Sequence, residues 1–142
     1  MPRVLGLDPG EARIGVALSD PTGTIASPHT YIDVREGNAV DAINLICVEM
    51  EIETVVIGLP LRLDGSEGPA AERSRTLGKA VESVVGSDVD VRYWDERFTT
   101  LTAEDALIEG NVRRSKRKTT RDQIAAAVML QGYLDRQAAE DR

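Results

Sequence analysis

The sequence has very few of the side chains that bind soft metals or form covalent crosslinks. Its 142 residues include one cysteine, Cys47, and one histidine, His29. A single cysteine cannot form an internal disulfide, and this pair alone cannot complete a zinc site of nitrogen and sulfur ligands. Any metal bound by this chain must therefore be held by oxygen.

Long apolar runs are also missing. No stretch approaches the about 20 apolar residues that span a bilayer, and the N-terminus lacks the charged, apolar and cleavage regions of a signal peptide. We therefore expect a cytoplasmic protein without a membrane partner. With 42% hydrophobic and 29% charged residues, the chain has the composition and length of one globular domain covering residues 1–142.

Aromatic side chains are scarce, with one Trp, one Phe and three Tyr, so a surface that binds single strands by stacking many bases is not expected. The net charge of −7 argues against a surface that is basic throughout. The basic residues are nevertheless concentrated. Six of the 17 Lys and Arg residues lie close together: Arg113, Arg114, Lys116, Arg117, Lys118 and Arg121. This segment can be locally positive in an acidic chain.

The apolar periodicity predicts an α/β fold. Strands are predicted at residues 4–7, 14–18, 24–32, 54–59 and 89–94, and helices at residues 38–51, 70–85, 102–110 and 120–134. The order is β-β-β-α-β-α-β-α-α. The first three strands would form an antiparallel meander, whereas the first, fourth and fifth, which helices separate, would be parallel. We expect a mixed five-stranded sheet flanked by helices, with ligands bound at the carboxyl ends of the parallel strands.

One carboxylate lies where such a sheet binds ligands. Asp8 ends the first predicted strand and precedes a tight Pro9-Gly10 turn. A carboxylate beside exposed backbone amides can hold a metal or a phosphate without leaving a buried charge unpaired. Asp-Pro-Gly is also common β-turn chemistry, so completing a hairpin is the alternative role of Asp8.

Further carboxylates are candidates for the same site. Asp95 and Glu96 follow the fifth strand and share an edge with Asp8 if the strands are parallel neighbours. Asp122 lies in the first turn of the last helix, which the sequence does not place relative to that edge. A solvated strand end for Glu96 and a favourable charge on the helix dipole for Asp122 are the alternatives. Together, Asp8, Glu96 and Asp122 suit Mg²⁺ or Mn²⁺, and two such ions can promote phosphodiester hydrolysis.

Four segments, in this order, resemble the YqgF (RuvX) family: GLDPGEARIGVALSD, VVIGLPLRLDGSEGPAAERSRTLG, WDERFTT and RDQIAAAVMLQGYL. The resemblance covers nearly the whole chain. Members of this family are bacterial RNase-H-like proteins, described as pre-16S rRNA nucleases and, under an older label, as Holliday-junction resolvases. The resemblance implies an RNase-H-like fold and a divalent-metal nuclease site.

The resemblance also implies roles for individual residues. It assigns Asp8, Glu96 and Asp122 to the catalytic and metal-binding site. In the related junction resolvases the middle carboxylate comes from another strand, at a position like that of Gly58, so Asp95 stays a possible substitute for Glu96.

Basic residues near the acids are candidates for binding nucleic acid. Arg13, Arg97 and the basic segment can make charge-assisted contacts that position a phosphate backbone without reading its sequence. Surface ion pairing is the alternative for Arg13 and Arg97. The candidates in the basic segment are Arg113, Arg114, Lys116, Arg117 and Lys118.

The resulting prediction is a metal-dependent endonuclease that matures the 5′ end of pre-16S rRNA in the ribosomal particle, acting as a monomer or homodimer. A Holliday-junction resolvase acting on branched DNA is the first alternative. A nucleotide-binding module is a second, although the chain lacks room for another lobe and has no G-x-x-x-x-G-K-[ST] motif. A noncatalytic RNA- or protein-binding domain is a third.

Overall fold

The computed structural model describes residues 3–98 and 121–140. Its centre is a five-stranded sheet with the strand order β3-β2-β1-β4-β5. The strands are β1 (Arg3–Pro9), β2 (Arg13–Ser19), β3 (Ala26–Asp33), β4 (Ile52–Leu59) and β5 (Asp90–Asp95). The pairs β1–β2 and β2–β3 are antiparallel, whereas β1–β4 and β4–β5 are parallel. The predicted mixed sheet is confirmed.

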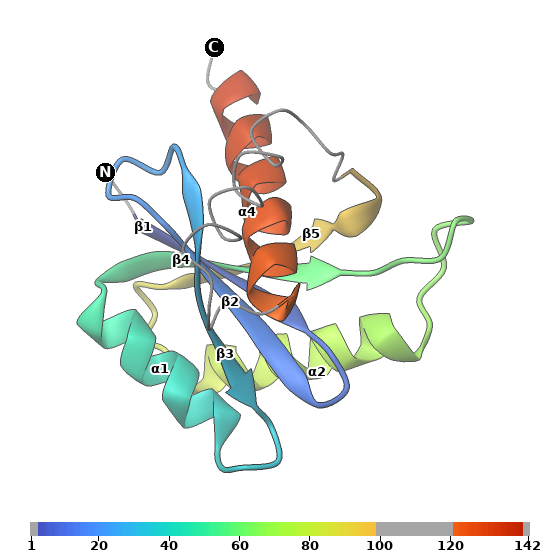
Figure 1. The fold of residues 1–142 in the computed structure, drawn as a ribbon, viewed down its shortest axis with the longest axis horizontal. Coiled ribbons are helices and arrows are strands. Elements are labelled where there is room, and N and C mark those ends of the chain that lie inside the picture. Colours follow the sequence, from blue (N-terminus) through green and yellow to red (C-terminus); the bar gives the residue numbers. More distant parts are fainter. Residues whose placement is uncertain (1–2, 99–120, 141–142) are drawn as a thin grey trace.

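Helices cover both faces of the sheet. They are α1 (Ala39–Glu49), α2 (Pro69–Val84) and α4 (Arg121–Glu140), and a short 3₁₀ turn, η1 (Glu96–Phe98), follows β5. Figure 1 shows α4 crossing one face of the sheet, while α1 and α2 lie against the other. The described elements therefore form three layers.

The central strands are apolar without interruption because both faces are covered. Successive residues of a strand point to opposite faces, so Val56 packs in the core beneath α4 with Leu130. Its neighbours Val55 and Ile57 pack in the core on the other side, together with Ile43 of α1. The run in β4 thus joins two separate cores.

The strand and helix boundaries differ from the predicted ones mainly at β3. Thr24 and Ile25 belong to the preceding turn, because the Asp20 carboxylate accepts hydrogen bonds from their N–H groups at 2.8 and 2.9 Å. The last helix extends to Glu140, beyond the predicted end at residue 134. The predicted helix at 102–110 and the basic segment at 112–119 lie outside the described residues.

A buried glutamine fixes α4 across the antiparallel part of the sheet. Gln131 is only 4% exposed. Its side-chain oxygen accepts a hydrogen bond from the Ala26 N–H at 2.9 Å, and its side-chain nitrogen donates to the Thr24 carbonyl at 3.0 Å. No helix in the described part of the chain is both long enough and apolar enough to cross a bilayer.

Candidate active site

One row of residues crosses the whole sheet at the level of Asp8. Asp8 pairs with Gly15 of β2, and because Leu7 pairs with Ile57 of the parallel strand β4, Gly58 is the next residue along on the other side of Asp8. Gly15 pairs in turn with Tyr31 of β3, and Gly58 pairs with Trp94 of β5. Residues paired across strands point to the same face. Because Trp94 belongs to the core beneath α4, this row faces α4.

The two glycines leave space for acids that come from other elements. A Cβ atom at Gly58 would lie 2.9 Å from Oε1 of Glu96, so the Glu96 carboxylate occupies the volume of a side chain at position 58. A Cβ atom at Gly15 would collide with the backbone oxygen of Asp122, so the first turn of α4 rests directly on β2. Asp8, Glu96 and Asp122 gather because the neighbours of Asp8 have no side chains.

The end of β4 is held from the opposite face of the sheet. The Ser74 hydroxyl of α2 is fully buried and donates a hydrogen bond of 2.8 Å to the carbonyl of Gly58. Buried polar groups are stable when they are paired in this way. This bond fixes the backbone against which the Glu96 carboxylate packs.

Asp8 and Glu96 are joined by a side-chain hydrogen bond, which requires a proton on one of the two carboxyl groups. Burial raises the pKa of Asp8; the bond to Glu96 opposes this shift, and the charge of Asp122 adds to it. Burial, followed by the charge of Asp8, raises the pKa of Glu96 to about 8. Without a cation the pair therefore retains a proton at neutral pH.

Asp122 stands beside this pair but faces an arginine. Its carboxylate lies 3.8 Å from Nη1 of Arg13, and the Arg13 guanidinium lies over the ring of Tyr31, 5.1 Å from the ring centroid. Within the described ranges, no three Asp, Glu, His or Cys side chains are already arranged around one metal position. The structure thus brings Asp8 and Glu96 into contact and Asp122 into electrostatic range.

Asp95 and Arg97, both candidates from the sequence, bind each other. Arg97 donates to the Asp95 carboxylate through Nε at 3.1 and 3.0 Å and through Nη2 at 2.7 Å. These hydrogen bonds lower the pKa of Asp95. Nη1 of Arg97 lies 3.4 Å from the carbonyl oxygen of Leu63 and donates to it. Asp95 therefore pairs with Arg97, whereas Glu96 contacts Asp8.

The chemistry of these side chains fits a hard divalent cation. All three candidate ligands are carboxylates, which suit Mg²⁺ and Mn²⁺. Burial raises the pKa of both Asp8 and Glu96 and so favours their protonated forms, and metal binding to such groups displaces protons. Cys47 is buried in the core on the α1 side of the sheet, so the thiol is not near this site.

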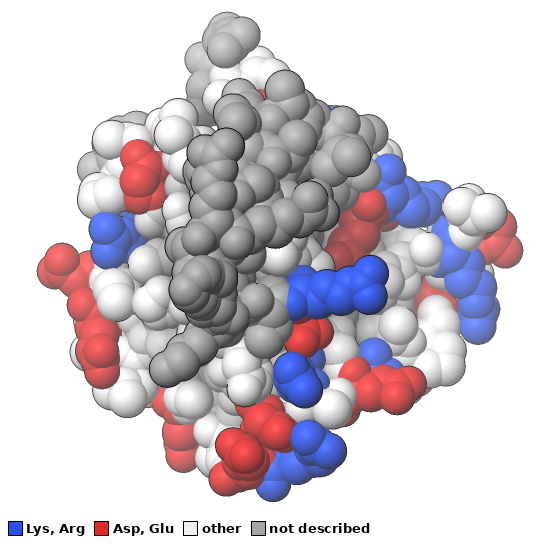
Figure 2. All heavy atoms as spheres, in the orientation of Figure 1, with Lys and Arg blue, Asp and Glu red and all other residues white. Residues whose placement is uncertain are grey.

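Charges of both signs lie close together around the start of α4. Figure 2 shows acidic and basic side chains adjoining one another around the start of this helix. The remaining candidates for phosphate binding, Arg113, Arg114, Lys116, Arg117 and Lys118, lie outside the described residues.

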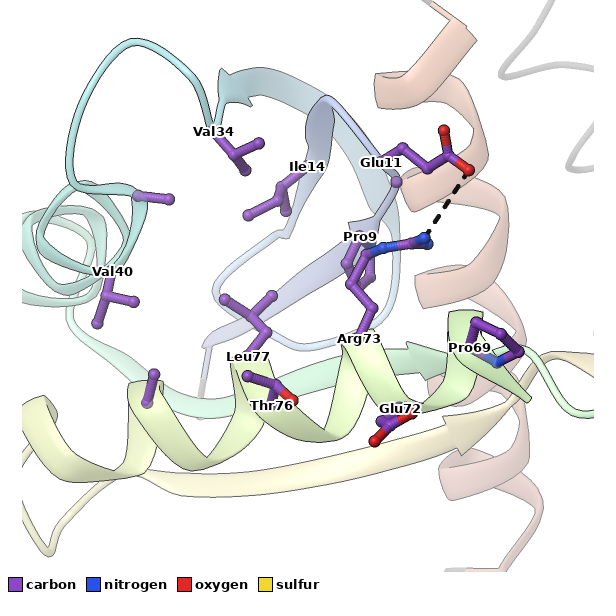
Figure 3. A pocket seen from close by; sticks show the side chains of 13 residues that line it. Pro9, Glu11, Ile14, Val34, Val40, Pro69, Glu72, Arg73, Thr76 and Leu77 are labelled. Atoms are coloured by element: carbon purple, nitrogen blue, oxygen red, sulfur yellow. Dashed lines mark ion pairs between the residues drawn. The ribbon is translucent and has the colours of Figure 1, made fainter. Parts of the chain in front are cut away.

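A cavity of about 510 Å³ lies behind the turn that follows Asp8, on the face covered by α1 and α2. Figure 3 shows that Pro9, Ile14 and Leu77 line it, with an ion pair of 4.0 Å between Arg73 and Glu11 at its edge. None of the three candidate carboxylates lines this cavity.

Gly15 and Tyr31 were not predicted as parts of the site, and Gly58 entered only as the position that corresponds to a carboxylate in the related junction resolvases. A signal for the two glycines was present, because glycine inside a strand often marks the close approach of another backbone or side chain. Tyr31 had no such signal, since its position beside Asp8 follows only from the registers of β2 and β3.

The chain is similar to known proteins over nearly its whole length. A family model named RuvX, described as Holliday junction resolvase, matches residues 2–136. A protein of Clostridium botulinum (strain Alaska E43 / Type E3), called "Putative pre-16S rRNA nuclease", is 44% identical over 137 residues, which cover 94% of this chain and 97% of that protein. A protein of the same name from Clostridium kluyveri (strain ATCC 8527) is 41% identical over 135 residues, with 94% and 97% coverage.

Solved structures share the fold. A Thermus thermophilus RuvC in complex with a Holliday junction substrate superposes with a TM-score of 0.68 at 12% identity, covering 97% of this chain and 96% of that one. A second T. thermophilus RuvC structure gives a TM-score of 0.66 at 14% identity, with 96% of each chain covered. At these identities the likeness concerns the fold alone, which is RNase-H-like. From the family match over residues 2–136, the chain belongs to the RuvX family of nucleases.

Proposed function

We propose that this chain is a divalent-metal-dependent endonuclease whose catalytic site is formed by Asp8, Glu96 and Asp122. The observation that carries the proposal is that the Glu96 carboxylate fills the space at Gly58, on one side of Asp8, while the backbone of Asp122 packs on Gly15 at the other side. Carboxyl groups gathered in this way repel one another unless protons or cations neutralise them. Perturbed groups that share one site are typical of functional sites. The nuclease names of the relatives support the hydrolase class.

The three acids would hold Mg²⁺ or Mn²⁺, which supplies an activated water and neutralises charge on the attacked phosphate. Asp8 occupies the centre of the row and contacts groups on both sides. Glu96 would hold the metal as a carboxylate, and so without the proton that its raised pKa favours in the metal-free chain. Asp122, which lies 3.8 Å from Nη1 of Arg13, would be the third ligand, and Arg13 would then be available to a phosphate of the substrate.

We propose the 5′ end of pre-16S rRNA as the substrate. The names of the relatives support this choice. Four-way DNA is the second candidate, supported by the description of the family model and by the fold shared with RuvC. With either substrate, arginine and lysine contacts to the phosphate backbone would provide most of the binding, including contacts from the segment at residues 113–118.

The test compares cleavage of labelled precursor rRNA and of a four-way DNA junction in Mg²⁺, in Mn²⁺ and in EDTA. We expect one substrate to be cut only with metal, and roughly a 100-fold loss of rate in Asp8→Asn and in Glu96→Gln. Asp95→Asn is the matched control, because Asp95 neighbours Glu96 but pairs with Arg97. It should keep the native rate within a few fold.

Three outcomes would overturn the proposal. Cleavage that persists in EDTA or in Asp8→Asn would exclude the proposed site. Unaltered binding without cleavage would identify a noncatalytic nucleic-acid-binding domain. Binding of ATP without cleavage of either nucleic acid would identify a nucleotide-binding module.

A further inference from the structure

We propose that Tyr31 is a positioning residue that holds Arg13 ready to bind a substrate phosphate, so that the substrate backbone passes over the β2–β3 side of the sheet. The inference rests on the proposed nuclease function and adds to it a phosphate-binding residue, its support and a direction for the substrate.

Tyr31 belongs to the same row as the central acid. Asp8 pairs with Gly15, and Gly15 pairs with Tyr31, so all three residues point to the face that bears α4. Two strand spacings separate the strands of Asp8 and Tyr31, which is about 10 Å. Since Gly15 between them has no side chain, the tyrosine ring lies at the border of the site.

Among residues 3–98 and 121–140, none accepts a hydrogen bond from the Arg13 guanidinium. Its nearest carboxylate in the described part of the chain is that of Asp122, and the distance of 3.8 Å is too long for a hydrogen bond. It is also 43% exposed. A guanidinium carries five N–H donors that match the geometry of a phosphate.

Two other arginines near the sheet use their donors on carboxylates. Arg35 binds Asp33 at 3.1 and 3.0 Å. Arg97 binds Asp95 with three contacts between 2.7 and 3.1 Å. Compared with these two, Arg13 is the arginine beside the acids that is prepared to bind an anion from outside.

The tyrosine ring restricts where this guanidinium can lie. Tyr31 is 40% exposed, and the guanidinium lies 5.1 Å from its ring centroid, within the range of a cation–π interaction. An exposed arginine loses rotamer freedom when it binds a phosphate. Stacking on the ring reduces that loss beforehand, while the N–H edge stays free to donate. Tyr31 therefore affects substrate binding through Arg13 without touching the substrate.

The test uses a double-mutant cycle on the substrate that the native enzyme cuts. We expect Tyr31→Leu to raise KM about two- to fivefold with little change in kcat, and Tyr31→Phe, which keeps the ring, to behave like the native chain. Arg13→Met should raise KM about tenfold, as expected for a lost charged hydrogen bond. The double variant should be no worse than Arg13→Met alone, since Tyr31 acts through Arg13.

Substrates with one methylphosphonate, which removes a single phosphate charge, locate the contact. At one position next to the cut, this change should slow the native enzyme and Tyr31→Phe but not Arg13→Met. The matched control is Arg136→Met, because Arg136 also lies over an aromatic ring, that of Phe98 at 5.5 Å, but near the other end of α4. It should leave KM unchanged.

Independent effects of Arg13 and Tyr31, a fall in kcat without a change in KM, or methylphosphonate sensitivity that persists in Arg13→Met would overturn the inference. Thermal melts of each variant exclude loss of folding as the cause. Dissociation constants measured in EDTA repeat the comparison without cleavage. A chain that cuts nothing but binds according to this series would refute the nuclease proposal alone, whereas an enzyme that cuts equally well with every variant would refute the roles of Arg13 and Tyr31 and leave the nuclease proposal intact.

Discussion

The side chains absent at positions 15 and 58 decide where the carboxylates lie. Glu96 fills the space that a residue at position 58 would take, and the backbone of Asp122 fills the space beside Gly15. A methyl group would meet a different obstacle at each position. At position 58 it would meet the flexible end of the Glu96 side chain, and at position 15 it would meet the backbone of α4.

Gly58→Ala should therefore separate activity from stability. We expect at least a tenfold loss of cleavage, as a rough estimate, with a change of less than about 1 kcal/mol in the free energy of unfolding, because Glu96 can move aside. Gly15→Ala should lower that free energy by about 1–3 kcal/mol, because α4 must shift. Initial rates and urea unfolding measure both effects.

Gly37→Ala is the control for this pair, since a Cβ atom there would have nothing within 4 Å. Both quantities should stay at their native values in this variant. An active Gly58→Ala enzyme would show that the Glu96 carboxylate does not need its present position.

The proton shared by Asp8 and Glu96 predicts a dependence of stability on pH. The pKa of Glu96 is raised from 4.5 to about 8 in the folded chain. The free energy of unfolding is therefore highest at pH values below the pKa of Glu96 in the unfolded chain, and it falls as the pH rises toward the pKa of Glu96 in the folded chain. Glu96→Gln should remove this fall and stabilise the metal-free protein in alkaline solution by about 1–2 kcal/mol, allowing for partial exposure. Urea unfolding in EDTA across the pH range measures the effect.

The contribution of Asp95 to stability should depend on pH in the opposite sense. Arg97 lowers the pKa of Asp95, so this contribution is present above the ordinary pKa of an aspartate and is lost as the pH falls. The Asp95→Asn variant should lose at most about 1 kcal/mol of unfolding free energy near neutral pH, as for an exposed ion pair.

Equal pH profiles of stability for the native chain and Glu96→Gln would contradict the proton shared by Asp8 and Glu96.

The sequence singled out Asp8, Glu96 and Asp122 as candidate acids, but it left the choice between Glu96 and its neighbour Asp95 open. Asp95 and Glu96 are adjacent, and strand alternation would point them to opposite faces. Trp94, which directly precedes them, faces α4, so the alternation places Glu96 on that face and Asp95 on the other. The sequence did not reveal this, because the face on which Trp94 is buried depends on the position of α4, which residue types alone do not specify.

At the scale of elements, the position of α4 completes the site. The helix itself was predictable from its apolar spacing. Its direction across the sheet was not, because the segment before it is long enough to reach either end of the sheet. The contacts that decide the matter are long-range ones, from Gln131 to Ala26 and from Asp122 to Gly15.

Gln131→Leu should weaken the attachment of α4 to the sheet. It leaves the buried Ala26 N–H without its partner, which costs about 1–3 kcal/mol. Urea unfolding measures the loss, and hydrogen exchange at the Ala26 amide localises it. Gln137→Leu on the same helix should cost less than about 0.5 kcal/mol. Native stability in Gln131→Leu would show that other contacts hold the helix.

For the whole molecule, metal binding and folding should be linked. Adding Mg²⁺ or Mn²⁺ should raise the free energy of unfolding, by about 2.7 kcal/mol when the ion is at 100 times its dissociation constant. The rise should disappear in Asp8→Asn and persist in Asp95→Asn. Thermal melts over a series of ion concentrations measure it, and an equal rise in native chain and Asp8→Asn would place the ion elsewhere.

The architecture was predictable because few arrangements satisfy the order of elements. Strands joined through helices run parallel, and strands joined by short turns run antiparallel, which yields the observed mixed sheet. The exact registers were not predictable, because they depend on packing between β1, β2 and β4. The row that joins Asp8 to Tyr31 is a product of those registers.

The order of the acids along the chain has a consequence during protein synthesis. The segment that carries Asp122 leaves the ribosome after all five strands. A growing chain can therefore pair its sheet before Asp122 is available. If the three acids act together as proposed, cleavage would have to wait until α4 has packed on β2, so the order of the acids along the chain would delay activity until late in folding.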